Sequence, residues 1–320
     1  MIALAACCAG PLTACSPSAP VGENPPLRVA GRTGAGPAEF NYPRAIAVAR
    51  DGGVFVVDKG GRIQHFTADG EFVGAWRTPA IDAGKPTGVG VAPDGRLFVA
   101  DTHYARILIY SPSGELIRTF GEYGDGPGRF RLPTDVLVRP DGSFYVSEYG
   151  GNDRVSHYTA DFAYISSFGG ADAGEARLAR PQSLALSPEG DLWVADACNH
   201  RICRFSADGE FRAAFGRLGS GHGELRFPYG VTVLSDGTLV VTEYGNNRVQ
   251  RFTPEGVSLG VWGAAGRSPG RLAYPWAAAA LPDDRVVIVD SGNNRLQWIA
   301  GRRSTTWSIP GPPRATVVSK

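Results

Sequence analysis

One sequence unit of about 47 residues recurs six times in this chain of 320 residues, and this repetition limits the choice of fold more than any other feature. In every unit a proline precedes a short apolar run, and successive prolines are 43, 47, 48, 47 and 47 residues apart: Pro43, Pro86, Pro133, Pro181, Pro228 and Pro275. An acidic residue that closes the following β-rich run keeps the same five spacings: Asp58, Asp101, Glu148, Asp196, Glu243 and Asp290. Two independent landmarks with one period indicate six copies of one structural unit.

Each unit also carries the turn signals of four short strands. The first apolar run ends at a turn such as Asp236-Gly237, and Asp-Gly between β-rich runs indicates a hairpin because both residues tolerate a positive φ. A second strand ends at the acidic residue, a third follows a short polar loop, and a fourth ends at an aromatic residue before glycine, as at Phe120-Gly121. We therefore predict an all-β fold, a six-bladed β-propeller with four-stranded antiparallel blades.

Two recurring strings resemble the NHL repeat. One is Asp-x-x-Asn-x-Arg, seen at 196–201 and 290–295, and the other is the glycine-rich loop at 120–133. The resemblance extends over about residues 27–309 and implies the same propeller. It implies less about activity, because propellers of this kind host unrelated functions.

A propeller ring must be closed, and two segments compete to form the outermost strand of the sixth blade. Leu27 to Gly31 precedes Pro43 by the same 12 residues that separate Gly121 from Pro133. Residues 305–309 also fit this position. We expect the N-terminal segment to take it, because pairing the two ends of the chain prevents the ring from opening.

The N-terminal residues predict export and a lipid anchor. Residues 1–15 contain a short apolar run without charge, and Leu12 to Cys15 resembles the lipobox of bacterial lipoproteins, which implies acylation of Cys15. No Lys or Arg precedes the run, which departs from the pattern, and the alternative is an unprocessed N-terminus. We expect a Pro- and Ser-rich tether at 16–26, the propeller at 27–310 and a tail at 311–320, on the periplasmic side or surface of the cell envelope.

The loop-rich face of the propeller is the candidate for binding, because long loops on a rigid scaffold usually carry function. The residue after each repeat proline should begin the innermost strand and ring the mouth of the central channel: Arg44, Thr87, Thr134, Gln182, Tyr229 and Trp276. Tyr149 and Tyr244 lie in nearby loops. We predict that the neighbours Tyr229, Trp276 and Arg44 bind a sugar ring or apolar group together with a carboxylate. The alternative is that the aromatic rings only fill the channel mouth.

The sequence gives less support to two kinds of catalytic site, a zinc site built from histidines and a calcium site built from carboxylates. None of the six ring residues is histidine, whereas the related amidating lyases place zinc ligands there, and the five histidines are scattered: His65, His103, His157, His200 and His222. The six acidic residues are expected to cap turns and pair with the arginine that follows. The alternative is calcium held by two or three of them, as in gluconolactonase-like propellers, which the chain resembles in architecture only. That alternative would make the protein a hydrolase or lyase of small molecules.

The remaining signals favour a binding protein. Asp135 is expected to cap a nearby backbone group, and Cys198 and Cys203 either form a disulfide across a turn or are small buried side chains. A net charge of +1 gives no electrostatic support for nucleic-acid binding. We predict a monomeric, non-catalytic scaffold without a cofactor that binds a protein, peptide or glycan.

Overall fold

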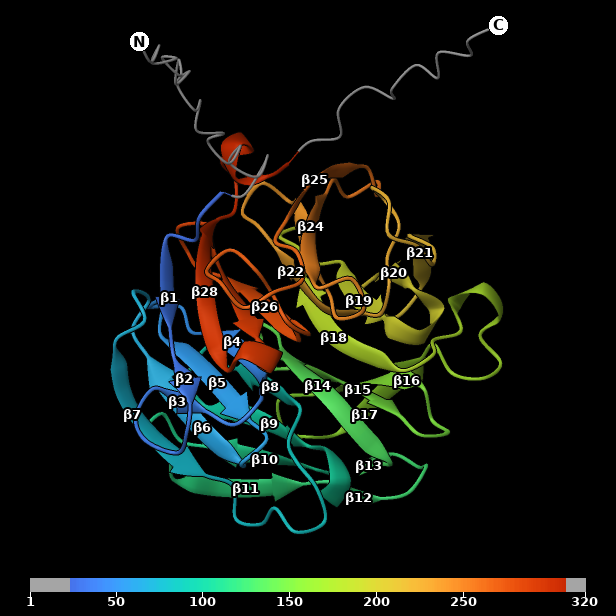
Figure 1. The fold of residues 1–320 in the computed structure, drawn as a ribbon. Coiled ribbons are helices and arrows are strands. Elements are labelled where there is room, and N and C mark those ends of the chain that lie inside the picture. Colours follow the sequence, from blue (N-terminus) through green and yellow to red (C-terminus); the bar gives the residue numbers. More distant parts are fainter. Residues whose placement is uncertain (1–23, 309–320) are drawn as a thin grey trace, which may run out of the picture.

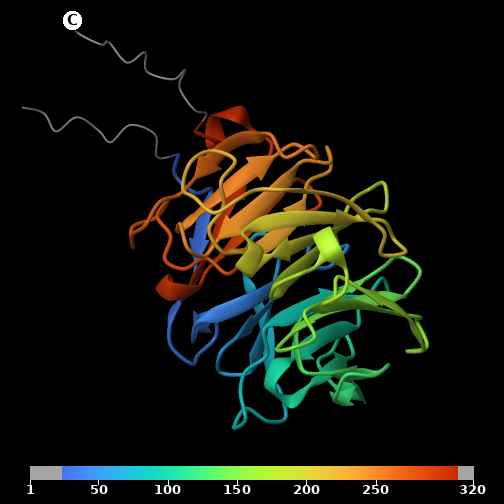
Figure 2. The same cartoon turned by 90° about the vertical axis from the view of Figure 1, so that its right-hand side faces the viewer.

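The computed structural model describes residues 24–308 and arranges them as six four-stranded antiparallel sheets around a central axis. Figures 1 and 2 show these sheets following one another in chain order around a closed ring. The predicted six-bladed β-propeller is thereby confirmed. Cys15, the predicted signal segment and the tail at 311–320 lie outside the described residues.

The first three blades run from the innermost to the outermost strand in chain order. Blade one contains β4 (Pro43–Val48), β5 (Val54–Asp58), β6 (Arg62–Phe66) and β7 (Phe72–Arg77). Blade two contains β8 (Gly88–Val91), β9 (Leu97–Asp101), β10 (Arg106–Tyr110) and β11 (Leu116–Phe120). Blade three contains β14 (Leu132–Val138), β15 (Phe144–Tyr149), β16 (Arg154–Tyr158) and β17 (Tyr164–Phe168).

The last three blades complete the ring. Blade four contains β18 (Pro181–Leu186), β19 (Leu192–Asp196), β20 (Arg201–Phe205) and β21 (Phe211–Phe215). Blade five contains β22 (Pro228–Val233), β23 (Leu239–Glu243), β24 (Arg248–Phe252) and β25 (Ser258–Trp262). Blade six contains β26 (Ala277–Ala280), β27 (Arg285–Asp290), β28 (Arg295–Ala300) and, from the start of the chain, β1 (Arg28–Ala30).

Short elements occupy the loops between these strands. Two small parallel pairs form in the glycine-rich loops, β2 (Arg32–Thr33) with β3 (Glu39–Phe40) and β12 (Glu122–Tyr123) with β13 (Arg129–Phe130). The 3-10 turns are η1 (Thr102–Tyr104), η2 (Gly174–Ala176), η3 (Ala197–Asn199), η4 (Ser291–Asn293) and η5 (Ser304–Thr306). None of the helices in residues 24–308 has the length and hydropathy needed to cross a membrane.

The hydrophobic core is divided among the interfaces between neighbouring blades. Phe66 of blade one and Trp298 of blade six belong to one buried cluster, and Phe98 of blade two and Phe144 of blade three belong to another. Middle strands have a neighbouring blade on each side, so both of their faces are buried. This explains why a segment such as 54–57 is apolar throughout instead of alternating.

The N-terminal strand closes the ring. β1 pairs with the outer edge of β28, with Arg28 opposite Trp298, and Figure 1 shows the blue strand beside the red one. The competing segment at 305–309 has a different place in its described part. Trp307 is buried beside blade five, and Ser308 bridges Val261 of β25. The edge of β28 is already paired with β1, so it has no free groups for the C-terminal segment.

Deleting residues 1–32 should lower the melting temperature by several degrees, because the deletion leaves the outer edge of β28 unpaired. A deletion of residues 1–23 is the matched control, since it leaves β1 in place. Thermal unfolding followed by circular dichroism measures both variants. Equal melting temperatures for the two variants would show that closure does not depend on β1.

Candidate functional site

The innermost strands of all six blades line a central cavity of about 310 Å³. Five of the predicted ring residues lie on its wall: Arg44, Thr87, Gln182, Tyr229 and Trp276. The sixth, Thr134, is buried, and its hydroxyl donates to the carbonyl oxygen of Pro181 at 2.6 Å. Thr134 therefore connects two neighbouring inner strands.

A backbone irregularity accompanies the residue after the proline in most blades, including three of the five residues on the cavity wall. In four blades the pairing of the innermost strand skips one residue, and the skipped residues are Arg44, Thr134, Gln182 and Tyr229. Each is the extra residue of a β-bulge. A bulge redirects a side chain away from the regular alternation of a strand and is frequent beside functional sites.

The predicted aromatic arc is assembled at the channel mouth. Tyr229 and Tyr244 stack with their ring centroids 4.6 Å apart, and Trp276 meets them edge-on at 5.0 and 5.8 Å. The guanidinium carbon of Arg44 lies 4.9 Å from the centroid of the Trp276 ring. The structure thus brings together residues of blades one, five and six. Tyr149 joins this group through Arg180, whose guanidinium carbon lies 4.7 Å from the Tyr149 centroid and 5.9 Å from that of Tyr229.

Three residues of this group were missed from the sequence: Tyr42, Arg180 and Tyr274. Tyr274 packs 5.2 Å from Tyr244 between ring centroids, and the hydroxyls of Tyr42 and Tyr244 are 3.3 Å apart. Each missed residue directly precedes a repeat proline, whereas the prediction considered only the residue that follows it. The sequence could have indicated these residues, because each repeat proline here is preceded by a large side chain. We call Tyr42, Tyr229, Tyr244, Tyr274 and Trp276 the aromatic cluster.

The backbone before these prolines is held in an uncommon conformation. Tyr42, Arg180 and Tyr274 have φ values of 52°, 55° and 50°, a left-handed region that few residues other than glycine occupy. The blade before each of them supplies a hydrogen-bond acceptor. Asn294 accepts from the N–H of Tyr42 at 2.6 Å, and Asn247 accepts from that of Tyr274 at 2.7 Å. Side chains of one blade therefore support the site residues of the next.

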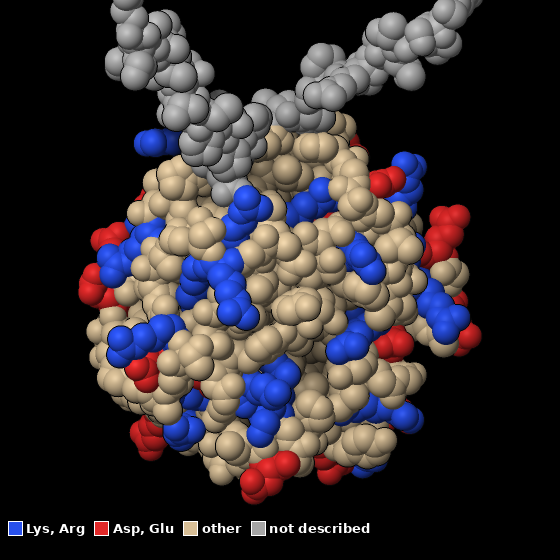
Figure 3. Space-filling view, in the orientation of Figure 1, with Lys and Arg blue, Asp and Glu red and all other residues tan. Residues whose placement is uncertain are grey.

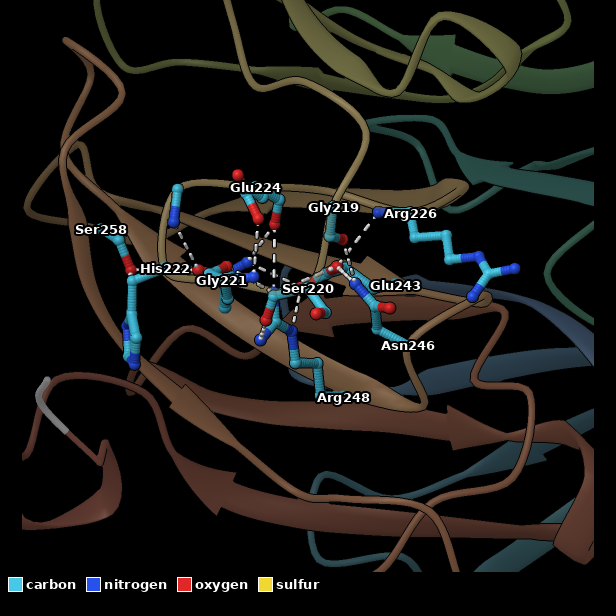
Figure 4. Close-up of polar contacts among 12 residues, drawn as sticks. Gly219, Ser220, Gly221, His222, Glu224, Arg226, Glu243, Asn246, Arg248 and Ser258 are labelled. Atoms are coloured by element: carbon cyan, nitrogen blue, oxygen red, sulfur yellow. Dashed lines mark hydrogen bonds and ion pairs between the residues drawn. The ribbon is translucent and has the colours of Figure 1, made fainter.

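The six acidic residues have the structural role that their spacing predicted. Figure 4 shows the site of blade five, where buried Glu243 accepts from Arg248 Nε at 2.6 Å and from Gln250 Nε2 at 2.7 Å. Arg248 also donates to the carbonyl oxygens of Ser220 and Gly221 in the glycine-rich loop. The equivalent pairs are Asp58–Arg62, Asp101–Arg106, Glu148–Arg154, Asp196–Arg201 and Asp290–Arg295. We call these six pairs the acid–arginine network.

The loop that leads to the innermost strand of the same blade is attached to these carboxylates. The N–H groups of Arg131, Ala179 and Ala273 donate to Glu148, Asp196 and Asp290 at 2.6, 2.7 and 2.7 Å. Burial raises the pKa of Glu148, Glu243, Asp101 and Asp290, and their arginine partners oppose this change. The acids therefore hold the loops that deliver the channel residues.

Residues 81–275, more than half of the chain, match the family described as the SMP-30/gluconolactonase/LRE-like region. The chain belongs to this family. The NHL repeat family also matches, at residues 272–299, in agreement with the recurring strings. The likeness to gluconolactonases was expected in architecture only, and the family match extends it to sequence.

Several known proteins resemble parts of this family member in sequence or in fold. The human NHL repeat-containing protein 3 is 35% identical over 150 residues, which are 43% of this chain and 41% of that protein. The chain thus aligns with less than half of the length of this relative. Among solved structures, a streptogramin B lyase has a TM-score of 0.58 at 15% identity, covering 84% of this chain and 95% of its own. A putative gluconolactonase has a TM-score of 0.60 at 18% identity, covering 81% and 88%. At such low identity these structures show a shared fold alone.

The channel of this family member does not offer the ligands that calcium requires. Calcium takes six to eight oxygen ligands at about 2.3–2.6 Å. Among the residues that line the cavity, Asp135 is the only carboxylate. Its two oxygens accept backbone N–H groups from Val136 and from Leu184 of the next blade, both at 2.9 Å. Asp135 is therefore the backbone cap predicted from the sequence, with an added link to blade four.

The histidines of the loop-rich face support backbone in the same way. His200 accepts from the N–H of Phe227 at 3.1 Å, and His103 accepts from the N–H of Lys85 at 3.2 Å. His65 and His157 stack on Phe55 and Tyr145. Within residues 24–308, no three His, Cys, Asp or Glu side chains are grouped closely enough to hold a metal ion.

Cys198 and Cys203 are separate free thiols, so the disulfide considered from the sequence is not formed. Cys203 is buried in β20, with its Sγ 3.7 Å from the carboxylate of Asp196. Cys198 is exposed in the turn η3, which follows Asp196. The group that lies beside the Cys203 thiol is thus the carboxylate of Asp196. Burial raises the pKa of both thiols, to about 12 for Cys203.

Asp135 should make stability depend on pH. Enclosure in the channel raises its pKa from 3.8 to about 7, so the folded protein holds a proton that the unfolded chain releases above about pH 4. Its contribution to stability is present below that pH and is lost as the pH rises to about 7. From pH 5 to pH 8 the free energy of unfolding should fall by about 2–3 kcal/mol relative to Asp135→Asn. Urea denaturation of both proteins measures this difference, and parallel pH profiles would contradict it.

Proposed function

We propose that this propeller is a non-catalytic scaffold that binds a protein, peptide or glycan at the mouth of its channel. The observation that supports this most directly is the aromatic cluster. Its members come from blades one, five and six and meet on the loop-rich face, around the opening of the cavity. Aromatic rings of this kind dominate recognition of apolar side chains and sugar rings.

The exposure of the cluster supports a binding role over a packing role. Tyr274 is 51% exposed, and Tyr42, Tyr244 and Trp276 are partly exposed. By contrast Trp193 and Trp298, which fill interfaces between blades, are 2% and 0% exposed. Four of the five rings of the aromatic cluster thus keep surface open to solvent, whereas Tyr229, at 9% exposed, is buried among them.

A hydrolase or lyase is the alternative, and the family match together with the lyase fold neighbour supports it. The chemistry of the channel favours the scaffold. All six acidic residues are paired with arginines, five of them also accept a backbone N–H group, and Asp135 caps two inner strands. Within residues 24–308, no three His, Cys, Asp or Glu side chains are grouped closely enough to hold the cation that the alternative requires.

The proposal includes anchoring of the scaffold to the bacterial cell envelope through Cys15. Its support is the lipobox-like sequence from Leu12 to Cys15, followed by the Pro- and Ser-rich tether. The described chain begins at Asn24, whose carbonyl oxygen accepts from Trp262 on the outermost strand of blade five. A tether that arrives there, at the outer edge of the propeller, would leave the channel mouth accessible.

Trp276→Ala should weaken ligand binding by about 1–3 kcal/mol without changing the melting temperature. The wild-type protein is first screened on peptide and glycan arrays, and the strongest array ligand is then titrated by calorimetry. Tyr164→Ala is the matched control, because Tyr164 is an exposed aromatic residue on the outer strand of blade three. Equal affinity of wild type and Trp276→Ala, or a melting temperature that falls while binding persists, would refute the site.

Cys15→Ala should abolish acyl labelling and move the protein from the membrane to the soluble fraction. The experiment uses metabolic labelling with a fatty acid in a bacterial host that processes lipoproteins. Cys8→Ala is the control, because Cys8 lies in the same segment outside the lipobox-like sequence. Labelling that survives the loss of Cys15 would exclude this anchor.

A further inference from the structure

The channel mouth carries two arginines whose charge is not compensated within the described chain. Arg44 of blade one and Arg180, which precedes blade four, form no ion pair or side-chain hydrogen bond with any residue in 24–308, and their Nε atoms are buried without a partner. Asp153 accepts from the backbone N–H of Arg180, not from its guanidinium. The arginines of the acid–arginine network, by contrast, all have carboxylate partners.

Aromatic rings hold these two guanidinium groups in place. Arg44 lies over Trp276, and Arg180 lies over Tyr149. An arginine held over an aromatic ring in this way keeps its N–H donors free for other partners, and the planar fork of these donors matches a carboxylate. The two side chains are thus positioned before any ligand arrives, which lowers the entropic cost of binding.

The electrostatics of the mouth favour an anion. Desolvation lowers the pKa of Arg44 from its ordinary value, and the positive charge of Arg180 acts in the same direction, whereas Tyr42, Tyr149 and Tyr244 oppose the change. Charge that is partly buried and unpaired is costly, and a bound anion would compensate for it. On the face shown in Figure 3, basic side chains lie around the centre, whereas acidic side chains lie mostly toward the periphery.

We infer that Arg44 and Arg180 form a carboxylate-binding pair at the channel mouth. The ligand of the aromatic cluster is then an organic acid, in which a carboxylate is attached to a ring or to an apolar group. This inference deepens the proposed function and rests on it. The cavity of about 310 Å³ has room for one such group, and Gln182 on its wall adds an amide. Each guanidinium can bind one carboxylate through two parallel N–H donors.

The test uses the full chain and phenylacetate, an aromatic carboxylate, with phenylacetamide as its neutral counterpart. Binding is measured by saturation-transfer NMR and calorimetry at low and high salt. We expect phenylacetate to bind about tenfold or more tightly than phenylacetamide, because a charged hydrogen-bonded pair adds to the aromatic contacts. This preference should shrink at high salt and be lost in Arg44→Gln and in Arg180→Gln.

Arg118→Gln is the matched control. Arg118 stacks over Phe162 at 3.8 Å on the outer strand of blade two, away from the channel, so its loss should leave the preference unchanged. Two single variants at the mouth are used so that the test still stands if one of them fails to fold. Circular dichroism verifies the folding of each variant. Equal binding of the two probes would overturn the inference while leaving aromatic recognition intact. Binding of inorganic phosphate in place of phenylacetate, or no binding of either probe, would also overturn it, and the array screen decides separately on the proposed function.

Discussion

The buried ion pair between the acidic residue that ends each second strand and the arginine that begins each third strand is the interaction on which the rest of this propeller depends. Five of the six carboxylates also accept a backbone N–H from the loop that leads to the innermost strand, as Asp290 does from Ala273, whereas within residues 24–308 Asp101 is bound by its arginine alone. Removing one partner of a buried pair typically costs about 3–5 kcal/mol, since the remaining charge is left uncompensated. Five of these sites therefore fix loops from which the channel mouth is built.

This support has a consequence for the aromatic cluster. Tyr42 and Tyr274 lie directly before prolines in a left-handed conformation, which is costly for side chains of their size. Amides from the preceding blade hold them there, and in the case of Tyr42 the amide of Asn294 acts across the closure of the ring. The aromatic cluster is therefore distributed over several blades, and its geometry depends on an intact ring. Among the residues that line the cavity of this family member, Asp135 is the one carboxylate.

The unpaired arginines stand in contrast to this network. Arg248 and Arg44 are both partly buried, yet the first has a carboxylate and several carbonyl partners, and the second has the face of Trp276. A folded chain tolerates such a charge where stability is not the only constraint, and such exceptions concentrate at functional sites. Of the two arginines at the channel mouth that lack a carboxylate partner within residues 24–308, Arg44 lies on the wall of the cavity, and Arg180 lies near Tyr229 of the same wall.

The sequence by itself determined the number of blades, the four strands in each, the role of the six acidic residues and the identity of the ring residues after each proline. These features are local or periodic, because a hairpin turn, an apolar run and an acid followed by arginine each act within one repeat. Only the tertiary structure decided which side chains meet. The stacking of Tyr229 on Tyr244, the addition of Tyr42, Arg180 and Tyr274, the link from Asp135 to Leu184 and the separation of the two cysteines depend on bulges, positive φ angles and contacts between blades. Such contacts join residues far apart in the chain, and a repeat pattern places the blades without specifying how side chains of neighbouring blades pack.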